Sequence, residues 1–175
     1  CIWILTAQEP SLIKAIKKNN RPIGLFYASS SHVYASSENL IKETDAILPQ
    51  NSYGLTKYVS ELLLQDFSKS NSFLNLCIGR IFSFYHDTQK PPFLYPNLKK
   101  RFETEDLNAP FVLYGANSTR DFLPAEEVCS IIIKIVDKRA KGVVNIASGK
   151  PMKIIDFVKK IAPKNLNFKI NSEEK

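Results

Sequence analysis

The fold of this chain is decided by the stretch Ile23-Gly-Leu-Phe-Tyr-Ala28 and the three serines, Ser29-Ser30-Ser31, that follow it. The first six residues form a nearly continuous apolar run, which is typical of a strand buried on both faces of a parallel sheet. The serines come at the carboxyl end of that strand, which is the end where open α/β sheets bind ligands. The stretch therefore predicts a buried parallel strand with a polar tip that faces a ligand.

Helical and extended patterns alternate around this strand. The spacing of apolar residues predicts helices over residues 10–20, 52–70, 97–106, 125–138 and 153–162, and strands over residues 74–82, 111–114, 121–123, 143–147 and 166–170. Residues 35–51 and 85–96 are polar or rich in proline, and we expect loops there. Ser52 is placed to cap the second helix. Strands that alternate with helices predict an α/β fold with a parallel sheet in the first half.

Composition narrows the class of protein. The chain has 175 residues, of which 44% are hydrophobic, and six Gly and ten Pro are too few for collagen or a disordered linker. Its longest apolar runs are only a few residues, too short to cross a membrane. The three cysteines are widely spaced and form no CxxC, which favours a reducing cytoplasm. We interpret Cys77 and Cys129 as small buried side chains.

The charge balance favours anionic partners. Lys and Arg number 24 against 17 acids, a net charge of +7, which suits phosphorylated small molecules, acidic membrane surfaces or nucleic acid. The charge alone is weak support for nucleic-acid binding because no groove-reading motif accompanies it. His32 and His86 have no carboxylate or Cys at ligand spacing, so we expect no metal site.

The segment Tyr53-Gly-Leu-Thr-Lys57 is the strongest candidate for chemistry. Tyr53 and Lys57 are four positions apart, so on a helix both project from one face. A free tyrosine has a pKa of about 10 and is no base at neutral pH. A lysine ammonium about 4 Å away, at an effective dielectric of about 20, favours the phenolate by about 4 kcal/mol. The pair is therefore a candidate general base, although a surface helix carrying both residues without a role is the plainer alternative.

Five ordered motifs together resemble one family, the extended short-chain dehydrogenase/reductases, also called the NAD-dependent epimerase/dehydratases. They are Phe26–Tyr34 (FYASSSHVY), Asn51–Lys57 (NSYGLTK), Gly79–Phe82 (GRIF), Arg120–Pro124 (RDFLP) and Val144–Gly149 (VNIASG). The resemblance extends from about Phe26 to Ile161, which is most of the chain.

The resemblance implies roles for residues of the first half. Ser30 and Tyr53 match the catalytic Ser/Thr and the catalytic tyrosine of the family. Lys57 matches the catalytic lysine that lowers the pKa of the tyrosine and binds the nicotinamide ribose of NAD or NADP. Phe82 falls in the segment that contacts the nicotinamide, so Tyr53, Lys57 and Phe82 are the residues implied to bind the cofactor.

Other matches imply contacts with a substrate. Arg120 matches an arginine that clamps the diphosphate of a nucleotide sugar in related enzymes, a task suited to its fork of donors. Ser31 and Ser83 fall at positions implied to contact the sugar. Dehydratases of the family have Asp-Glu where this chain has Ser31-His32, and serine is a poor acid, so we expect no 4,6-dehydratase activity.

The resemblance also implies an architecture: a Rossmann-like parallel sheet, incomplete, with a small C-terminal α/β part that binds substrate. Residues 1–85 would hold the C-terminal part of the cofactor domain with the catalytic Ser, Tyr and Lys, and residues 86–175 mainly the substrate-binding part, with some segments returning to the sheet. The family's glycine-rich fingerprint is absent, because no two glycines of this sequence are close enough for GxGxxG. We expect a C-terminal portion of an enzyme with an open sheet edge along Ile23–Ala28.

The leading hypothesis is a portion of a nucleotide-sugar epimerase or ketoreductase, with hydride transfer between NAD(P) and a nucleoside-diphosphate sugar and Tyr53 as acid/base. The alternative is a non-catalytic member of the family that acts as a binding protein. By resemblance we expect a cytoplasmic homodimer formed through the Tyr53 helix, with neither nucleic acid nor membrane as a partner. The 175 residues alone are expected to be inactive and to bind NAD(H) or NADP(H) no better than millimolar.

Overall fold

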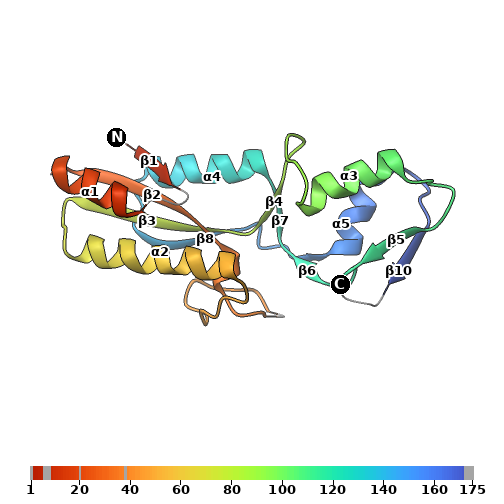
Figure 1. Cartoon of the computed structure of the whole chain (residues 1–175), viewed down its shortest axis with the longest axis horizontal. Helices are drawn as coiled ribbons and strands as arrows, with labels where there is room; N and C mark the ends of the chain where they lie inside the picture. Colours follow the sequence, from red (N-terminus) through yellow and green to blue (C-terminus); the bar gives the residue numbers. More distant parts are fainter. Residues whose placement is uncertain (1, 6–8, 20, 38, 172–175) are drawn as a thin grey trace. The chain divides into compact units, whose positions relative to one another are not determined.

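The chain forms two compact units in a computed structural model that describes residues 2–5, 9–19, 21–37 and 39–171, and the side chains of residues 13–18, 21–37 and 39–171. The first unit comprises Cys1–Phe82 and Glu126–Ala147, and the second comprises Ser83–Ala125 and Ser148–Lys175. Figure 1 colours the described residues along the sequence, from red through yellow and green to blue. The segment 126–147 thus returns to the first unit. The roles expected for residues 1–85 and 86–175 stay predictions.

A four-stranded parallel sheet forms the centre of the first unit. Its strands are β1 (Ile2–Leu5), β2 (Ile23–Ser30), β3 (Leu74–Ile81) and β8 (Gly142–Ile146), in the order β1-β2-β3-β8. β2 pairs with β3 from Ile23 opposite Leu74 to Ser30 opposite Ile81. The predicted α/β fold with a parallel sheet is confirmed.

Helices cover the sheet because its strands are apolar on both faces. α1 (Glu9–Asn19) and α2 (Ser52–Lys69) share one core cluster with alternate residues of β2 and β3, whose buried members include Ile16, Leu25, Tyr27, Leu64, Phe67, Leu76 and Ile78. α4 (Ala125–Asp137) lies along the opposite face of the sheet from α2 (Figure 1). The tip of β2 therefore emerges beside the first turns of α2.

The expectation of an open sheet edge along Ile23–Ala28 is wrong. β1 pairs with β2 in parallel, from Ile2 opposite Gly24 to Leu5 opposite Tyr27. From Gly24 to Tyr27, β2 is therefore paired with a neighbouring strand on both sides. β1 was not predicted because four residues at the start of the sequence are too short to show a periodic pattern.

The second unit is a small α/β assembly of short paired strands and two helices. β4 (Ser83–Tyr85) pairs with β7 (Phe122–Pro124), β5 (Phe111–Tyr114) with β10 (Phe168–Asn171), and β6 (Thr119–Arg120) with β9 (Met152–Lys153). α3 (Leu94–Thr104) and α5 (Ile154–Ile161) complete it. Its core is aromatic: the rings of Phe122 and Phe157 stack with their centroids 4.0 Å apart.

Three local expectations are wrong. The helix α3 begins at Leu94, inside the predicted loop, and Pro96 fits its first turn because backbone N–H groups there have no acceptor within the helix. Asn51 rather than Ser52 caps α2, since its Oδ1 accepts a hydrogen bond from the Gly54 N–H at 2.8 Å. Cys129 is exposed, whereas Cys77 is buried as expected.

Leu64 tests the core between α2 and the sheet, since none of its surface is exposed. Leu64→Ala should lower the free energy of unfolding by about 2–5 kcal/mol, because it removes apolar contacts and leaves a cavity. The matched control is Ile133→Ala on α4, where the side chain is 59% exposed and the change should stay within about 0.5 kcal/mol. Chemical denaturation measures both, and equal effects would contradict this packing.

Candidate active site

The predicted serine lies at the carboxyl end of β2. Ser30 is the last residue of the strand, and the 3₁₀ turn η1 (Ser31–Val33) follows it directly. The Ser30 Oγ accepts a hydrogen bond from the His32 N–H at 3.2 Å, which caps the turn. The Ser30 side chain is thereby held at the strand tip, where open α/β sheets bind ligands.

α2 presents Tyr53 and Lys57 at this tip. The Lys57 Nζ donates a hydrogen bond to the Ala28 carbonyl oxygen of β2 at 3.0 Å. The same Nζ lies 5.9 Å from the centroid of the Tyr53 ring. Lys57 is 8% exposed and Tyr53 is 53% exposed. A fixed ammonium and an accessible phenol therefore project together from the first turns of α2.

His32 and Asn51 border Tyr53. The His32 and Tyr53 rings meet edge to face with their centroids 5.8 Å apart. The Asn51 Oδ1 is occupied by its capping bond to Gly54, so its Nδ2 is the atom that faces the His32 Nδ1 at 3.2 Å. An amide N–H donates, so Asn51 can donate a hydrogen bond to this ring nitrogen.

Gly54 allows α2 to approach η1 closely. A Cβ built on Gly54 would lie 2.2 Å from the His32 carbonyl oxygen, which is a backbone atom that cannot move aside easily. Only glycine therefore fits where the helix start meets the turn. Sequence reasoning quoted this glycine within the motif but assigned it no role.

A buried ion pair that the sequence analysis does not predict joins α2 to β3. Glu61 of α2 is 0% exposed and Arg80 of β3 is 4% exposed. The Arg80 Nη2 donates to the Glu61 Oε2 at 2.7 Å, and its Nε lies 3.1 and 3.2 Å from the two carboxylate oxygens. The Ser29 hydroxyl donates to the same carboxylate. Glu61 thus joins α2, β2 and β3.

The network continues toward β8 and the long loop that follows Val33. The Arg80 Nη1 donates to the Tyr34 hydroxyl at 2.8 Å, and that hydroxyl donates to the Asn145 Oδ1 at 2.6 Å. The backbone N–H of Asn145 donates to the Glu43 carboxylate at 2.7 Å. Burial raises the pKa of Tyr34 against the opposing effect of Arg80, which keeps the hydroxyl proton that this chain of bonds needs.

The remaining predicted residues are divided between the units. Phe82 belongs to the first unit, where its N–H donates to the Ile146 carbonyl at 3.0 Å, and its ring centroid lies 6.4 Å from that of Tyr34. Ser83 and Arg120 belong to the second unit. Arg120 is exposed on β6, opposite Met152. Ser30, Ser31, Tyr53 and Lys57 therefore lie in the first unit, on the end of β2, on η1 and on the first turns of α2, whereas Ser83 and Arg120 lie in the second unit.

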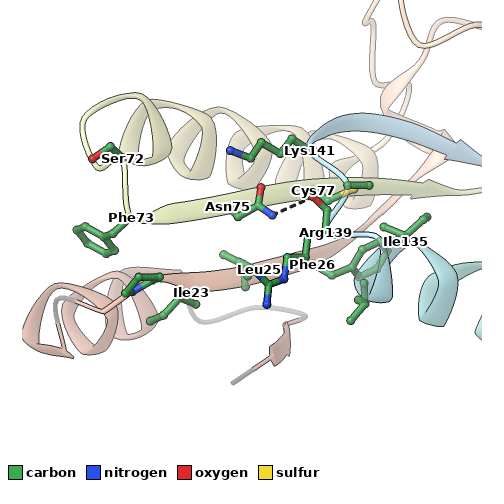
Figure 2. Close-up of a pocket in the computed structure, with 14 residues that line it drawn as sticks. Ile23, Leu25, Phe26, Ser72, Phe73, Asn75, Cys77, Ile135, Arg139 and Lys141 are labelled. Carbon is green, nitrogen blue, oxygen red and sulfur yellow. Dashed lines mark hydrogen bonds between the residues drawn. The ribbon is translucent and has the colours of Figure 1, made fainter.

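A cavity of about 600 Å³ lies elsewhere on the first unit. Figure 2 shows it against the amino-terminal halves of β2 and β3, with Phe26, Cys77 and Ile135 on its walls. The Asn75 Nδ2 donates to the Arg139 carbonyl at 3.0 Å across it. Because Ser30 lies at the carboxyl end of β2, this cavity belongs to the opposite end of the sheet from the candidate site.

The described residues contain neither a metal-binding cluster nor a membrane-spanning helix. No three His, Cys, Asp or Glu side chains among residues 13–18, 21–37 and 39–171 are grouped so that they could hold a metal ion. No helix in the described part of the chain is long and apolar enough to cross a membrane.

Comparison with known proteins identifies the family. The sequence profile of the family described as GDP-mannose 4,6 dehydratase matches residues 9–175. The chain belongs to this family of extended short-chain dehydrogenase/reductases. It is 30% identical to UDP-glucose 4-epimerase of Mycoplasma genitalium over 91% of this chain and 54% of that protein. GDP-6-deoxy-D-talose 4-dehydrogenase of Aggregatibacter actinomycetemcomitans is 25% identical over 81% of this chain and 47% of that protein.

Solved structures of family members have the same fold. UDP-N-acetylglucosamine 4-epimerase from Methanobrevibacter ruminantium superposes with a TM-score of 0.80 at 26% identity, covering 95% of this chain and 55% of that one. dTDP-glucose 4,6-dehydratase from Bacillus anthracis, solved with NAD, has a TM-score of 0.81 at 18% identity, covering 99% of this chain and 61% of that one. The chain thus spans about half the length of the relatives it matches.

Gly54 offers a test of the site's geometry. Gly54→Ala should lower the free energy of unfolding by about 1–3 kcal/mol, because the added methyl meets the His32 backbone. This effect opposes the roughly 1 kcal/mol that alanine gains over glycine within a helix. Gly24→Ala is the matched control, since a Cβ there meets nothing within 4 Å. Denaturant titration compares the two variants, and a stabilised Gly54→Ala protein would refute the close approach.

Proposed function

We propose that this chain carries the catalytic serine, tyrosine and lysine of a nucleotide-sugar epimerase or ketoreductase. One observation supports this above all. α2 places Tyr53 and Lys57 at the carboxyl end of β2, the strand that ends in Ser30, and the Lys57 ammonium is anchored to that strand by its bond to Ala28. In an open α/β sheet this is the place where a ligand binds.

Proton transfer is assigned to these side chains as follows. The Tyr53 hydroxyl, which is 53% exposed, takes a proton from the sugar hydroxyl that becomes a carbonyl and returns it when the carbonyl is reduced. The Ser30 hydroxyl hydrogen-bonds the same sugar oxygen and orients it. The Lys57 ammonium, held at a fixed position, stabilises negative charge on the tyrosine oxygen.

The residues of the site fit the nicotinamide and its ribose, one of the two nucleotide halves of NAD or NADP. A buried ammonium beside a phenol is a donor set suited to ribose hydroxyls, so Lys57 and Tyr53 would hold the nicotinamide ribose, and Phe82 would contact the ring. NAD or NADP, when bound, supplies the hydride acceptor and donor. This assignment is supported by solved relatives bound to NAD or NADPH. No glycine-rich turn for the diphosphate occurs in this sequence.

Substrate recognition is assigned to three further residues. Arg120 presents an exposed guanidinium, whose fork of donors suits the diphosphate of a nucleoside-diphosphate sugar. Ser31 and Ser83 would contact the sugar. The names of the relatives, a UDP-glucose 4-epimerase and a GDP-6-deoxy-D-talose 4-dehydrogenase, support epimerisation or oxidation and reduction of a sugar carbon. Ser31-His32 stands where dehydratases have Asp-Glu, which argues against dehydration.

We further propose a homodimer formed through α2. Leu55, Val59, Leu62 and Leu63 are between 46% and 53% exposed and follow one another at helical spacing on α2. A stripe of exposed aliphatic residues on a helix is typical of a surface that packs against another protein. A second copy of the same helix, with the same stripe, would cover it by two-fold symmetry.

A cytoplasmic location completes this proposal. Cys77 and Cys129 are free thiols, and Cys129 is exposed. Exposed free thiols suit a reducing compartment, since an oxidising one favours their conversion to disulfides.

Tyr53 is the residue whose removal tests the function. Tyr53→Phe in the full-length protein should lower turnover of a nucleoside-diphosphate sugar by about 10²–10⁴-fold, because the ring remains while the proton acceptor is lost. Tyr58→Phe, which removes a hydroxyl from the same helix, is the matched control and should keep its turnover. Circular dichroism verifies folding of both variants. Wild-type turnover in folded Tyr53→Phe would contradict the assignment.

The dimer is tested by placing a charge in the apolar stripe. Leu63→Lys should convert the dimer to a monomer, because two buried ammonium groups would face each other without partners. Light scattering after gel filtration reports the mass. Ile133→Lys, at a position that is 59% exposed on α4, is the control and should remain dimeric. A wild-type protein that is monomeric at all concentrations would rule out this interface.

A further inference from the structure

We propose that Glu61 is a positioning residue of the candidate site. Its buried carboxylate fixes α2 against the carboxyl ends of β2 and β3, and thereby keeps Tyr53 and Lys57 beside Ser30. The catalytic consequence rests on the function proposed above, whereas the positioning itself is a property of the fold. Glu61 touches no substrate in this proposal and acts through the residues it holds.

The spacing on α2 carries the proposal. Tyr53, Lys57 and Glu61 follow one another at intervals of four residues, so they form one row along the helix. Successive members of the row bind successive residues of β2: Lys57 donates to the Ala28 carbonyl, and Glu61 accepts from the Ser29 hydroxyl. Two attachments one helical turn apart, about 6 Å along the axis, fix both the translation and the rotation of α2 relative to the strand.

Arg80 gives the carboxylate a single orientation. Its guanidinium approaches both oxygens of Glu61 side-on, with Nε at 3.1 and 3.2 Å and Nη2 at 2.7 Å. Such paired contacts restrict the angle of the carboxylate as well as its distance. β3 lies next to β2 in the sheet. Glu61 therefore attaches α2 to both strands, to β2 through Ser29 and to β3 through Arg80. Ser29 directly precedes Ser30 in the chain. Fixing the Ser29 hydroxyl therefore also restricts the backbone of Ser30.

The same arginine extends the constraint to the turn after β2. Its Nη1 donates to the Tyr34 hydroxyl at 2.8 Å and lies 3.3 Å from the Glu43 carbonyl oxygen. η1, which contains Ser31 and His32, lies between Ser30 and Tyr34 in sequence. Both ends of this turn are therefore tied to Arg80, one through Ser29 and Glu61 and the other through Tyr34.

Stability alone does not account for such a pair. The desolvation free energy of two buried charges offsets much of their electrostatic attraction. Replacing such a pair with apolar side chains of similar volume therefore often leaves the free energy of unfolding unchanged or raises it. The pair does provide a fixed geometry, and a displacement of about 1 Å at a reacting centre can cost about 10²-fold in rate. Stability and positioning can therefore be separated by replacing both members of the pair.

The experiment uses the double variant Glu61→Met/Arg80→Met in the full-length protein. The matched control is Arg101→Met/Glu105→Met, which removes an Arg–Glu pair of the second unit whose side chains are 29% and 41% exposed. Thermal unfolding reports stability. The NMR cross-relaxation between the ring protons of His32 and Tyr53, whose centroids are 5.8 Å apart, reports the position of α2 without any need for activity.

A positioning role predicts that the double variant keeps a melting temperature close to the wild type while its ring contact weakens or disappears. The control variant keeps both. In the activity assay kcat of the double variant falls by about 10²-fold, and KM for the nucleotide sugar changes little, because Glu61 does not touch the substrate. A folded double variant with the wild-type ring contact and wild-type kcat overturns the proposal.

Ser29→Ala covers the case in which the double variant does not fold. It keeps the ion pair and removes only the bond from β2 to the carboxylate. Its ring contact should weaken and its kcat should fall by about 10-fold, and an unchanged contact contradicts the proposal. A wild-type protein without activity would defeat the proposed function alone, since the ring contact still decides whether Glu61 positions α2.

Discussion

The packing of α2 against the carboxyl end of β2 is the contact on which the rest of the first unit depends. Gly54 brings the helix start within backbone distance of η1, Lys57 binds the Ala28 carbonyl one turn later, and Glu61 binds Ser29 after another turn. Each contact involves a different residue of one short segment of chain. A helix held at three successive levels cannot slide without breaking all three. The positions of Tyr53 and Lys57 are therefore set by the contacts of α2 with β2 and η1.

This arrangement buries charged groups at the end of the sheet, which costs desolvation free energy. The Glu61 carboxylate and the Arg80 guanidinium are tolerated there because each has several partners within hydrogen-bond distance. A half-satisfied network would be worse than an apolar core. The network spans α2, β2, β3, β8 and the loop after η1, so these elements share one polar centre beside their apolar core.

The elements that could be predicted from sequence are those whose burial leaves a pattern of apolar residues. β2, β3 and α2 were predicted because one or two apolar faces recur over many residues. β1 is too short to show such a pattern, and Asn51 and Ser52 are both good capping residues that local sequence does not distinguish. Glu61 and Arg80 were missed because charged residues in a helix or strand normally indicate a solvent-facing position, and a pairing across 19 residues is visible only after folding.

The residues proposed for proton transfer and the arginine proposed for substrate recognition lie in different units. The proton transfer that we propose needs groups held at fixed distances, and Ser30, Tyr53 and Lys57 all lie in the unit with the parallel sheet. The proposed recognition of a sugar nucleotide needs surfaces that can vary, and Arg120 lies on the short strand β6 of the other unit. There the buried Asp121 fixes the neighbouring loop by accepting bonds from the N–H groups of Ser148 and Lys150. Under the proposed function, substitutions beside Arg120 would change which sugar nucleotide is held and leave the bonds from α2 to Ala28, Ser29 and Arg80 intact, because those bonds lie within the first unit.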